Sequence, residues 1–134
     1  MGKLLRFGVS LDSDILEKFD RHIKKKNYNC RSKALADLIR QEFIKEEWLK
    51  GGSIAGAITI VYNHHRRTLT DKLTGIQHDF QDIIISTQHI HLDHDNCMEI
   101  IAVKGKAAKI QKLSDILKAI KGVEHGTLSI STGG

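Results

Sequence analysis

The division of the chain is decided by residues 51–63, which read Gly-Gly-Ser-Ile-Ala-Gly-Ala-Ile-Thr-Ile-Val-Tyr-Asn. Gly51-Gly52-Ser53 is the Gly/Ser-rich break between two periodic segments of the 134-residue chain. Residues 54–63 are almost continuously apolar, which is typical of a strand that is buried on both faces. We therefore expect a domain boundary here, with one domain over residues 1–50 and a second over residues 51–134.

Beyond residue 63 the apolar spacing changes repeatedly between the helical and the strand period. It predicts helices over residues 67–78 and 106–120, and strands over residues 83–93, 98–104 and 127–131. Together with the strand over residues 54–63, the order is βαββαβ, which is the ferredoxin-like arrangement. The fold class that we expect is therefore α+β.

The N-terminal part reads as one strand followed by two helices. Residues 4–11 alternate, with the apolar side chains on one face and Arg6, Gly8 and Ser10 on the other. A helix of about 14 residues then begins at Asp12 or Ser13, and a second runs from Arg31 to Trp48. A lone strand has two unpaired edges, so we expect two copies of the chain to pair their strands into a ribbon.

Composition and charge exclude several classes of protein. The chain is 40% hydrophobic and 28% charged, as in ordinary globular proteins. It has neither an apolar run of about 20 residues that could span a membrane nor a secretory signal. Cys30 and Cys97 alone make no disulfide framework, so we expect a cytoplasmic protein without a membrane partner. The net charge is +5, and residues 1–50 carry most of the basic excess, which is compatible with an anionic partner.

The N-terminal pattern resembles the ribbon-helix-helix family of DNA-binding proteins. The resemblance rests on the alternating strand and on the segment from Tyr28 to Leu35, which opens the second helix. It implies a dimer whose ribbon lies in the major groove of double-stranded operator DNA. Arg6 could then bind guanine through two hydrogen bonds, Ser10 could donate or accept, and Gly8 would allow close approach. The alternative is that these side chains are the solvated face of a half-buried strand.

The strongest chemical signal is the segment Gln88-His-Ile-His-Leu-Asp-His-Asp-Asn-Cys97. His89 and His91 are two apart on a strand, so both point to one face. If residues 94–96 form a three-residue loop, Cys97 pairs opposite Asp93 and lies on the same face, and Glu99 lies opposite His91. A two-residue loop would instead turn Cys97 away. The fourth ligand of a metal site would be His78, from the same chain or from a neighbour.

The combination resembles the nickel-responsive transcriptional regulator family, NikR. A ribbon-helix-helix domain precedes a ferredoxin-like domain that carries His-x-His-x₅-Cys, with Gln77-His78 upstream. The resemblance implies an ACT-like second domain, a homotetramer that is a dimer of dimers, and one Ni(II) per chain. It implies His89, His91 and Cys97 of one subunit and His78 of the next as ligands, and a repressor of nickel uptake or other metal-handling genes. Three further residues are candidates to support the metal-binding side chains without touching the metal: Gln77, Glu99 and Tyr62. Tyr62 is equally well explained as a core aromatic.

Two other functions remain open at this point. The first is an ACT-type regulator that responds to a small molecule, and the second is a metalloenzyme. An enzyme would need an open coordination position and a positioned acid or base, and the sequence offers no such set. Imidazole and thiolate donors in a plane suit Ni(II) or Cu(II), whereas a tetrahedral arrangement suits Zn(II).

Three further features carry weaker expectations. His64 and His65 could line an accessory metal site, although solvent exposure explains them as well. Asp93, His94 and Asp95 could attract metal or could be ordinary turn residues. In the first turn of the second helix, members of the NikR family commonly carry a glutamate, with an aspartate four residues later, and these carboxylates are associated with a potassium ion. This chain has Lys33 and Asp37 at the two positions. A lysine cannot ligate a cation, but its ammonium group could occupy the place of one.

Overall fold

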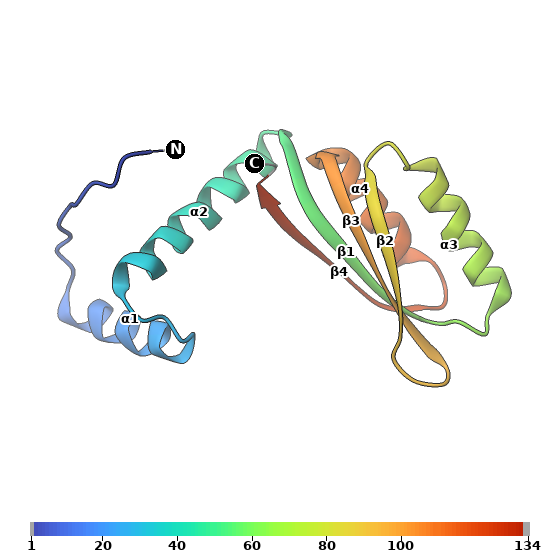
Figure 1. Ribbon diagram of the computed structural model, residues 1–134, viewed down its shortest axis with the longest axis horizontal. Coiled ribbons are helices and arrows are strands. Elements are labelled where there is room, and N and C mark those ends of the chain that lie inside the picture. The colour runs from blue at the N-terminus through green and yellow to red at the C-terminus, as the bar shows by residue number, and fades with distance from the viewer. Residues whose placement is uncertain (1, 133–134) are drawn as a thin grey trace. The chain divides into compact units, whose positions relative to one another are not determined.

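The structure is a computed structural model that describes residues 2–132, and its N-terminal region contains two helices. They are α1 (Ser13–Lys25) and α2 (Arg31–Leu49), as the apolar spacing predicts (Figure 1). The backbone of Asp12 begins α1, but its side chain makes no capping hydrogen bond. Asn27 reverses the chain after α1 with a φ of 64°, a left-handed conformation that asparagine tolerates better than most residues.

The expected strand over residues 4–11 is not formed in the single chain. No strand of the described residues pairs with this segment, so the ladder that defines a strand is missing. Its apolar side chains lie in solvent, with Leu4 93% and Phe7 74% exposed. The strand prediction is therefore wrong for one chain, and the physical reason is the unpaired edge. A ribbon formed between two copies stays a prediction.

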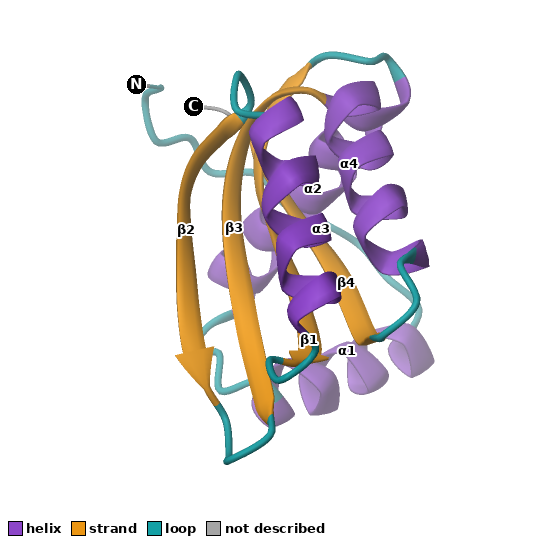
Figure 2. Cartoon of the chain, turned by 90° about the vertical axis from the view of Figure 1, so that its right-hand side faces the viewer, coloured by secondary structure: helices purple, strands orange, loops and turns teal. Residues whose placement is uncertain are grey.

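The remaining elements form a four-stranded antiparallel sheet with two helices. The elements in chain order are β1 (Ser53–Asn63), α3 (Arg67–Asp79), β2 (Ile84–His91), β3 (Asn96–Lys106), α4 (Ala107–Ala119) and β4 (Val123–Thr132). The spatial order β2-β3-β1-β4 gives the expected βαββαβ fold, and the α+β class is confirmed (Figure 2). Within the described residues, every helix is too short or too polar to cross a membrane.

The core lies between the sheet and the two helices that follow β1 and β3. Ile58 and Ile60 of β1 are fully buried, together with Leu73 of α3 and Leu113 of α4. Along β1 these buried side chains alternate with half-buried ones. The expectation that β1 is buried on both faces is therefore wrong for one chain, because α3 and α4 pack against one face.

The chain divides by its contacts into two compact units, Met1–Glu42 and Phe43–Gly134. The division lies inside α2, before the Gly51-Gly52-Ser53 break. The last turns of α2 belong to the second unit, because Trp48 packs against the core of the sheet.

Candidate metal centre

The β2–β3 hairpin brings the histidines and the cysteine of the metal motif onto one face. His91 pairs with Cys97, and His89 pairs with Glu99. An odd number of residues, 92–96, separates His91 from Cys97, so Cys97 lies on the face of the two histidines, as the loop argument requires. The expected register, with Cys97 opposite Asp93 and Glu99 opposite His91, is wrong by two residues.

The turn chemistry explains the shift of register. The Asp93 carboxylate accepts hydrogen bonds from the backbone N–H groups of Asp95 at 2.9 Å and Asn96 at 2.8 Å. An aspartate that caps its own turn in this way belongs to the loop and not to the strand. These bonds also hold the pKa of Asp93 below its usual value. The strand β2 therefore ends at His91.

Cys97 presents a buried, unpaired thiol beside an imidazole. Its side chain is 2% exposed, and its Sγ lies 3.7 Å from Nδ1 of His89. Tyr62 of β1 is its partner on the other neighbouring strand. A thiol and an imidazole nitrogen at this separation are a soft and a borderline donor that can share one transition-metal ion.

Glu99 is the polar centre of this part of the sheet. It is 2% exposed, accepts a hydrogen bond from the Tyr62 hydroxyl at 2.9 Å, and accepts another from Nε2 of Gln77 at 2.6 Å. Its Oε1 also lies 3.6 Å from Nε2 of His89. Burial, and then the hydrogen bond to Glu99, raise the pKa of Tyr62 above its usual value, so the phenol keeps the proton that it donates.

Tyr62, Gln77 and Glu99, the three residues expected to support the metal-binding side chains, thus form one hydrogen-bonded network. Gln77 and Tyr62 hold Glu99, and Glu99 faces His89 rather than His91. Thr87 extends the network, because its hydroxyl donates to Oε1 of Gln77 at 3.3 Å. Sequence reasoning missed Thr87, although its position two residues before His89 places it on the same face of β2.

His78 is exposed in the last turn of α3, directly after Gln77. In the described part of the chain, the only group of three ligand-type side chains whose donor atoms all lie within 4.8 Å of one another excludes His78, His89, His91 and Cys97. The four-ligand set therefore stays a prediction. The residues nevertheless fit a nickel ion, because the buried thiol, the adjacent imidazole and the carboxylate behind it are the donors and the support that such a site needs.

The candidate DNA-contacting residues lie in the first unit. Arg6, Gly8 and Ser10 are all exposed on the segment before α1. A Cβ atom added to Gly8 would meet no atom within 4 Å. The space at Gly8 is therefore open to a partner and is not required by the packing of this chain.

Comparison with known proteins places these features in a family. The sequence profile of the family described as "NikR C terminal nickel binding domain" matches residues 55–131. A protein of Syntrophus aciditrophicus (strain SB) that is named "Putative nickel-responsive regulator" is 62% identical over 98% of this chain and 96% of its own length. One of the same name from Chlorobium limicola is 55% identical over the full length of both chains.

Similarity to solved structures concerns the fold alone. An uncharacterised protein of Thermotoga maritima aligns with a TM-score of 0.51 and 17% identity, over 61% of this chain and 99% of its own. The family comparison is decisive, because the matched region contains the whole β2–β3 hairpin with its buried thiol. The chain belongs to the family of nickel-responsive regulators that carry the NikR C-terminal nickel-binding domain, which is a family of regulators and not of enzymes.

Proposed function

We propose that this protein is a nickel-dependent, sequence-specific DNA-binding repressor of nickel uptake or other metal-handling genes. The observation that carries the proposal is the free thiol of Cys97, buried and 3.7 Å from Nδ1 of His89. A buried thiol without a disulfide partner is inert in most proteins, but here its neighbours are an imidazole and a hydrogen-bonded carboxylate.

In the proposed site, His89, His91 and Cys97 of one subunit and His78 of the next hold one Ni(II) per chain. The exposure of His78 at the end of α3 supports a role at a subunit contact. Glu99 orients the His89 ring through Nε2 and leaves Nδ1 directed at the sulfur. When bound, nickel supplies a link between two subunits, and a homotetramer arranged as a dimer of dimers is the assembly that this link favours.

DNA binding is assigned to the N-terminal segment. Residues 4–11 lie before α1, no strand of the described residues pairs with them, and their apolar side chains are exposed. Pairing with the same segment of a second copy would bury these side chains and form a two-stranded ribbon. Arg6, Gly8 and Ser10 would then face the major groove of double-stranded operator DNA.

Nickel can regulate DNA binding only if it binds the DNA-competent arrangement more tightly than the other. Each tenfold difference in nickel affinity between the two arrangements contributes about 1.4 kcal/mol to DNA binding. The subunit-bridging ligand His78 provides such a difference, because its distance from the other three ligands depends on the arrangement of the subunits.

The test is a DNA-binding titration of the purified full chain. Duplexes selected from a random pool by the nickel-loaded protein are titrated with metal-free protein and with protein that carries one nickel per chain. We expect nickel to raise the affinity for the selected duplex, but not for a scrambled one, by at least tenfold. Equal affinities with and without nickel at several salt concentrations would refute the proposal, since salt alone changes DNA binding steeply.

A further inference from the structure

The side chain of Gln77 joins the last turn of α3 to two strands of the sheet. Its Nε2 donates to Oε1 of Glu99 on β3 at 2.6 Å, and its Oε1 accepts from the hydroxyl of Thr87 on β2 at 3.3 Å. Glu99 pairs with His89, which lies two residues after Thr87, so all three side chains share one face of the sheet. A single amide therefore ties α3 to both β2 and β3.

Glu99 decides which way round this amide lies. A carboxylate accepts hydrogen bonds and donates none, so the nitrogen of Gln77 faces it. The oxygen of Gln77 then faces Thr87, whose hydroxyl is the donor. The groups form a directed chain from hydroxyl to amide to carboxylate, in which each hydrogen bond polarises the next. The chain leads to His89, because Oε1 of Glu99 lies 3.6 Å from Nε2 of that ring.

The last turn of α3 is held more weakly than the turns before it. Leu69 and Leu73, the buried side chains of the helix, lie before Gly75. A Cβ atom added to Gly75 would meet no atom within 4 Å, so packing does not require this glycine, and a glycine inside a helix weakens it. Ile76 and Phe80, which follow, are only partly buried. The polar contacts of the last turn therefore matter for its position.

Gln77 is also the residue directly before His78, which the proposed function assigns to the nickel ion of the next subunit. The carbonyl of Gln77 accepts from the backbone N–H of Phe80 at 3.1 Å and so closes the helix. The backbone and the side chain of Gln77 thus both determine where the last turn lies. Whatever holds the Gln77 amide also sets the position from which His78 reaches out.

We propose that Thr87 is a positioning residue for nickel binding, whose hydroxyl holds the Gln77 amide and thereby fixes the turn that presents His78. The inference rests on the proposed function for the role of His78, whereas the hydrogen bond itself can be tested without nickel. Removing the hydroxyl leaves Oε1 of Gln77 without its donor, so the amide and the turn move more freely. His78 is then less often in place for the nickel ion, and nickel binds more weakly.

The first test compares nickel affinities of the full chain. Thr87→Val removes the hydroxyl and keeps the β-branched shape that suits a strand. We expect it to weaken nickel binding by about threefold to tenfold, the range of one net hydrogen bond. Thr87→Ser keeps a hydroxyl and should recover most of the affinity. Thr127→Val makes the same change at an exposed position of β4 and should leave the affinity unchanged.

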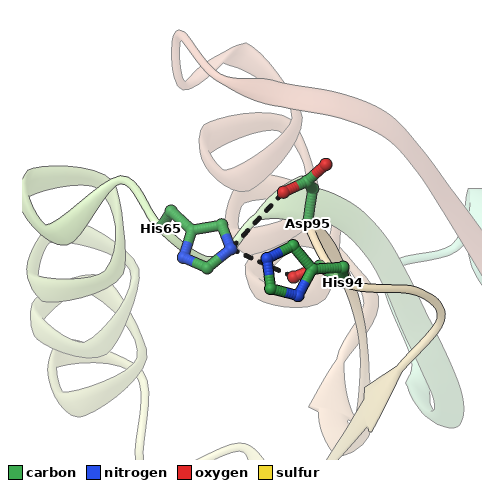
Figure 3. A group of neighbouring side chains, drawn as sticks. All are labelled: His65, His94 and Asp95. Carbon is green, nitrogen blue, oxygen red and sulfur yellow. Dashed lines mark hydrogen bonds and ion pairs between the residues drawn. The ribbon is translucent and has the colours of Figure 1, made fainter.

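The affinity is measured through the sulfur-to-nickel absorption, in competition with a chelator. His65, His94 and Asp95 lie together where the segment after β1 meets the β2–β3 loop, and their exposed side chains also offer ligand atoms (Figure 3). A count of all bound nickel would include any ion held there. The absorption reports only nickel that is bound to a thiolate, which in this test is that of Cys97.

A double-mutant cycle separates a path through Gln77 from any other effect of Thr87. Gln77→Leu removes both hydrogen bonds of the amide and should itself weaken nickel binding. In that background, Thr87→Val should change the affinity by less than about twofold, because the two side chains then no longer interact.

A second measurement needs no nickel. Amide hydrogen exchange in residues 76–80 should be about threefold to tenfold faster in Thr87→Val, whereas exchange in β1 should stay unchanged. A hydroxyl that merely stabilised the fold would instead speed exchange throughout the sheet. The proposal is overturned if either the nickel affinity or the exchange of residues 76–80 is the same in Thr87→Val as in the unmodified protein.

It is also overturned if Thr87→Ser binds nickel as weakly as Thr87→Val, or if the full effect persists in the Gln77→Leu background. Circular dichroism of each variant checks that the fold is retained. If nickel does not change DNA binding while the Thr87 variants behave as expected, the result contradicts the proposed function and not the role of Thr87.

Discussion

Oε1 of Glu99 lies 3.6 Å from Nε2 of His89. The opposite nitrogen of the same ring faces the sulfur of Cys97, so the ring stands between a buried carboxylate and a buried thiol. A carboxylate on the far nitrogen fixes the tautomer and the orientation of an imidazole and makes it a better metal ligand. If His89 binds nickel as we propose, Glu99 supports that ligand without touching the ion.

Replacing Glu99 by glutamine should weaken nickel binding by about 10–100-fold, the range that is typical when such a supporting residue is changed. The sulfur-to-nickel absorption should persist, because the thiolate is untouched. A competition titration with a chelator measures the affinity, and Glu124→Gln, which changes an exposed glutamate of β4, is the matched control. An unchanged affinity in Glu99→Gln would mean that the carboxylate serves only the fold.

Replacing Cys97 by alanine should abolish high-affinity nickel binding together with the near-ultraviolet absorption. The sulfur is the only soft donor in the proposed set, so the remaining imidazoles bind more weakly. Cys30→Ala is the control, because Cys30 is the exposed cysteine of the chain and lies at the start of α2. Nickel absorption that survived in Cys97→Ala would exclude the sulfur as a ligand.

In the β2–β3 hairpin, the side chains that share a face were more predictable than the register. The parity of the strand positions fixes which side chains share a face, and it correctly placed Cys97 with His89 and His91. The exact partner of each residue depends on where the loop begins, and that is decided by the hydrogen bonds of the Asp93 carboxylate. These bonds compete with strand pairing within the same few residues, so the alternation of apolar residues alone could not fix the register.

The strands of the sheet were predictable where apolar residues line a face that is buried in the same chain, as along β1 and β3. The segment over residues 4–11 has the same alternating pattern, but none of the strands in residues 2–132 pairs with it. Its pattern is a property of the sequence, whereas its pairing depends on a second copy. Thr87 illustrates the other limit: its spacing from His89 places it on the right face of β2, but its contact with Gln77 depends on the packing of α3, which the spacing does not reveal.

Replacing Tyr62 by phenylalanine should lower the free energy of unfolding by about 1–3 kcal/mol, because Oε2 of buried Glu99 loses its hydrogen-bond donor. The pKa of Tyr62 in the folded protein is raised above its usual value of 10.0 by burial and by the hydrogen bond to Glu99. The contribution of the Tyr62 hydroxyl to the free energy of unfolding is therefore fully present below pH 10.0, the pKa in the unfolded chain. It is lost as the pH rises through the raised pKa of the folded protein. Urea titrations at neutral and alkaline pH measure both effects. Equal alkaline losses in both proteins would contradict the assignment.

Replacing Arg6 by alanine should weaken binding to the selected duplex by about 1–3 kcal/mol and leave the nickel affinity of the free protein unchanged. The physical reason is that Arg6 is exposed on the segment proposed to face the major groove, in the unit that does not contain the nickel motif. Lys45→Ala changes the net charge equally at an exposed position of α2 and serves as the control. An equal loss on selected and scrambled duplexes would assign Arg6 to a phosphate contact.

Both oxygens of the Asp37 carboxylate accept hydrogen bonds from neighbouring side chains. Its Oδ1 accepts from Nζ of Lys33 at 2.8 Å and from Arg40 at 2.9 Å, and its Oδ2 accepts from the Tyr28 hydroxyl at 2.7 Å. The hydrogen bonds from Lys33 and then Tyr28 hold the pKa of Asp37 below its usual value, so the carboxylate stays ionised. The ammonium group of Lys33 thus lies beside Asp37, at the position where the resemblance to the NikR family implies a glutamate that is associated with potassium.

DNA binding by this protein should therefore depend little on potassium. The measurement compares the affinity for the selected duplex in potassium and in a bulky organic cation at matched ionic strength, because total salt alone changes DNA affinity steeply. Lys33→Glu should introduce a potassium-specific gain, since it replaces the ammonium group by a second carboxylate four residues before Asp37 on the same helix face. Lys33→Gln removes the charge without adding a ligand of that strength and should show a smaller gain. A large potassium-specific gain in the unmodified protein would show that the Lys33–Asp37 pair does not replace the cation.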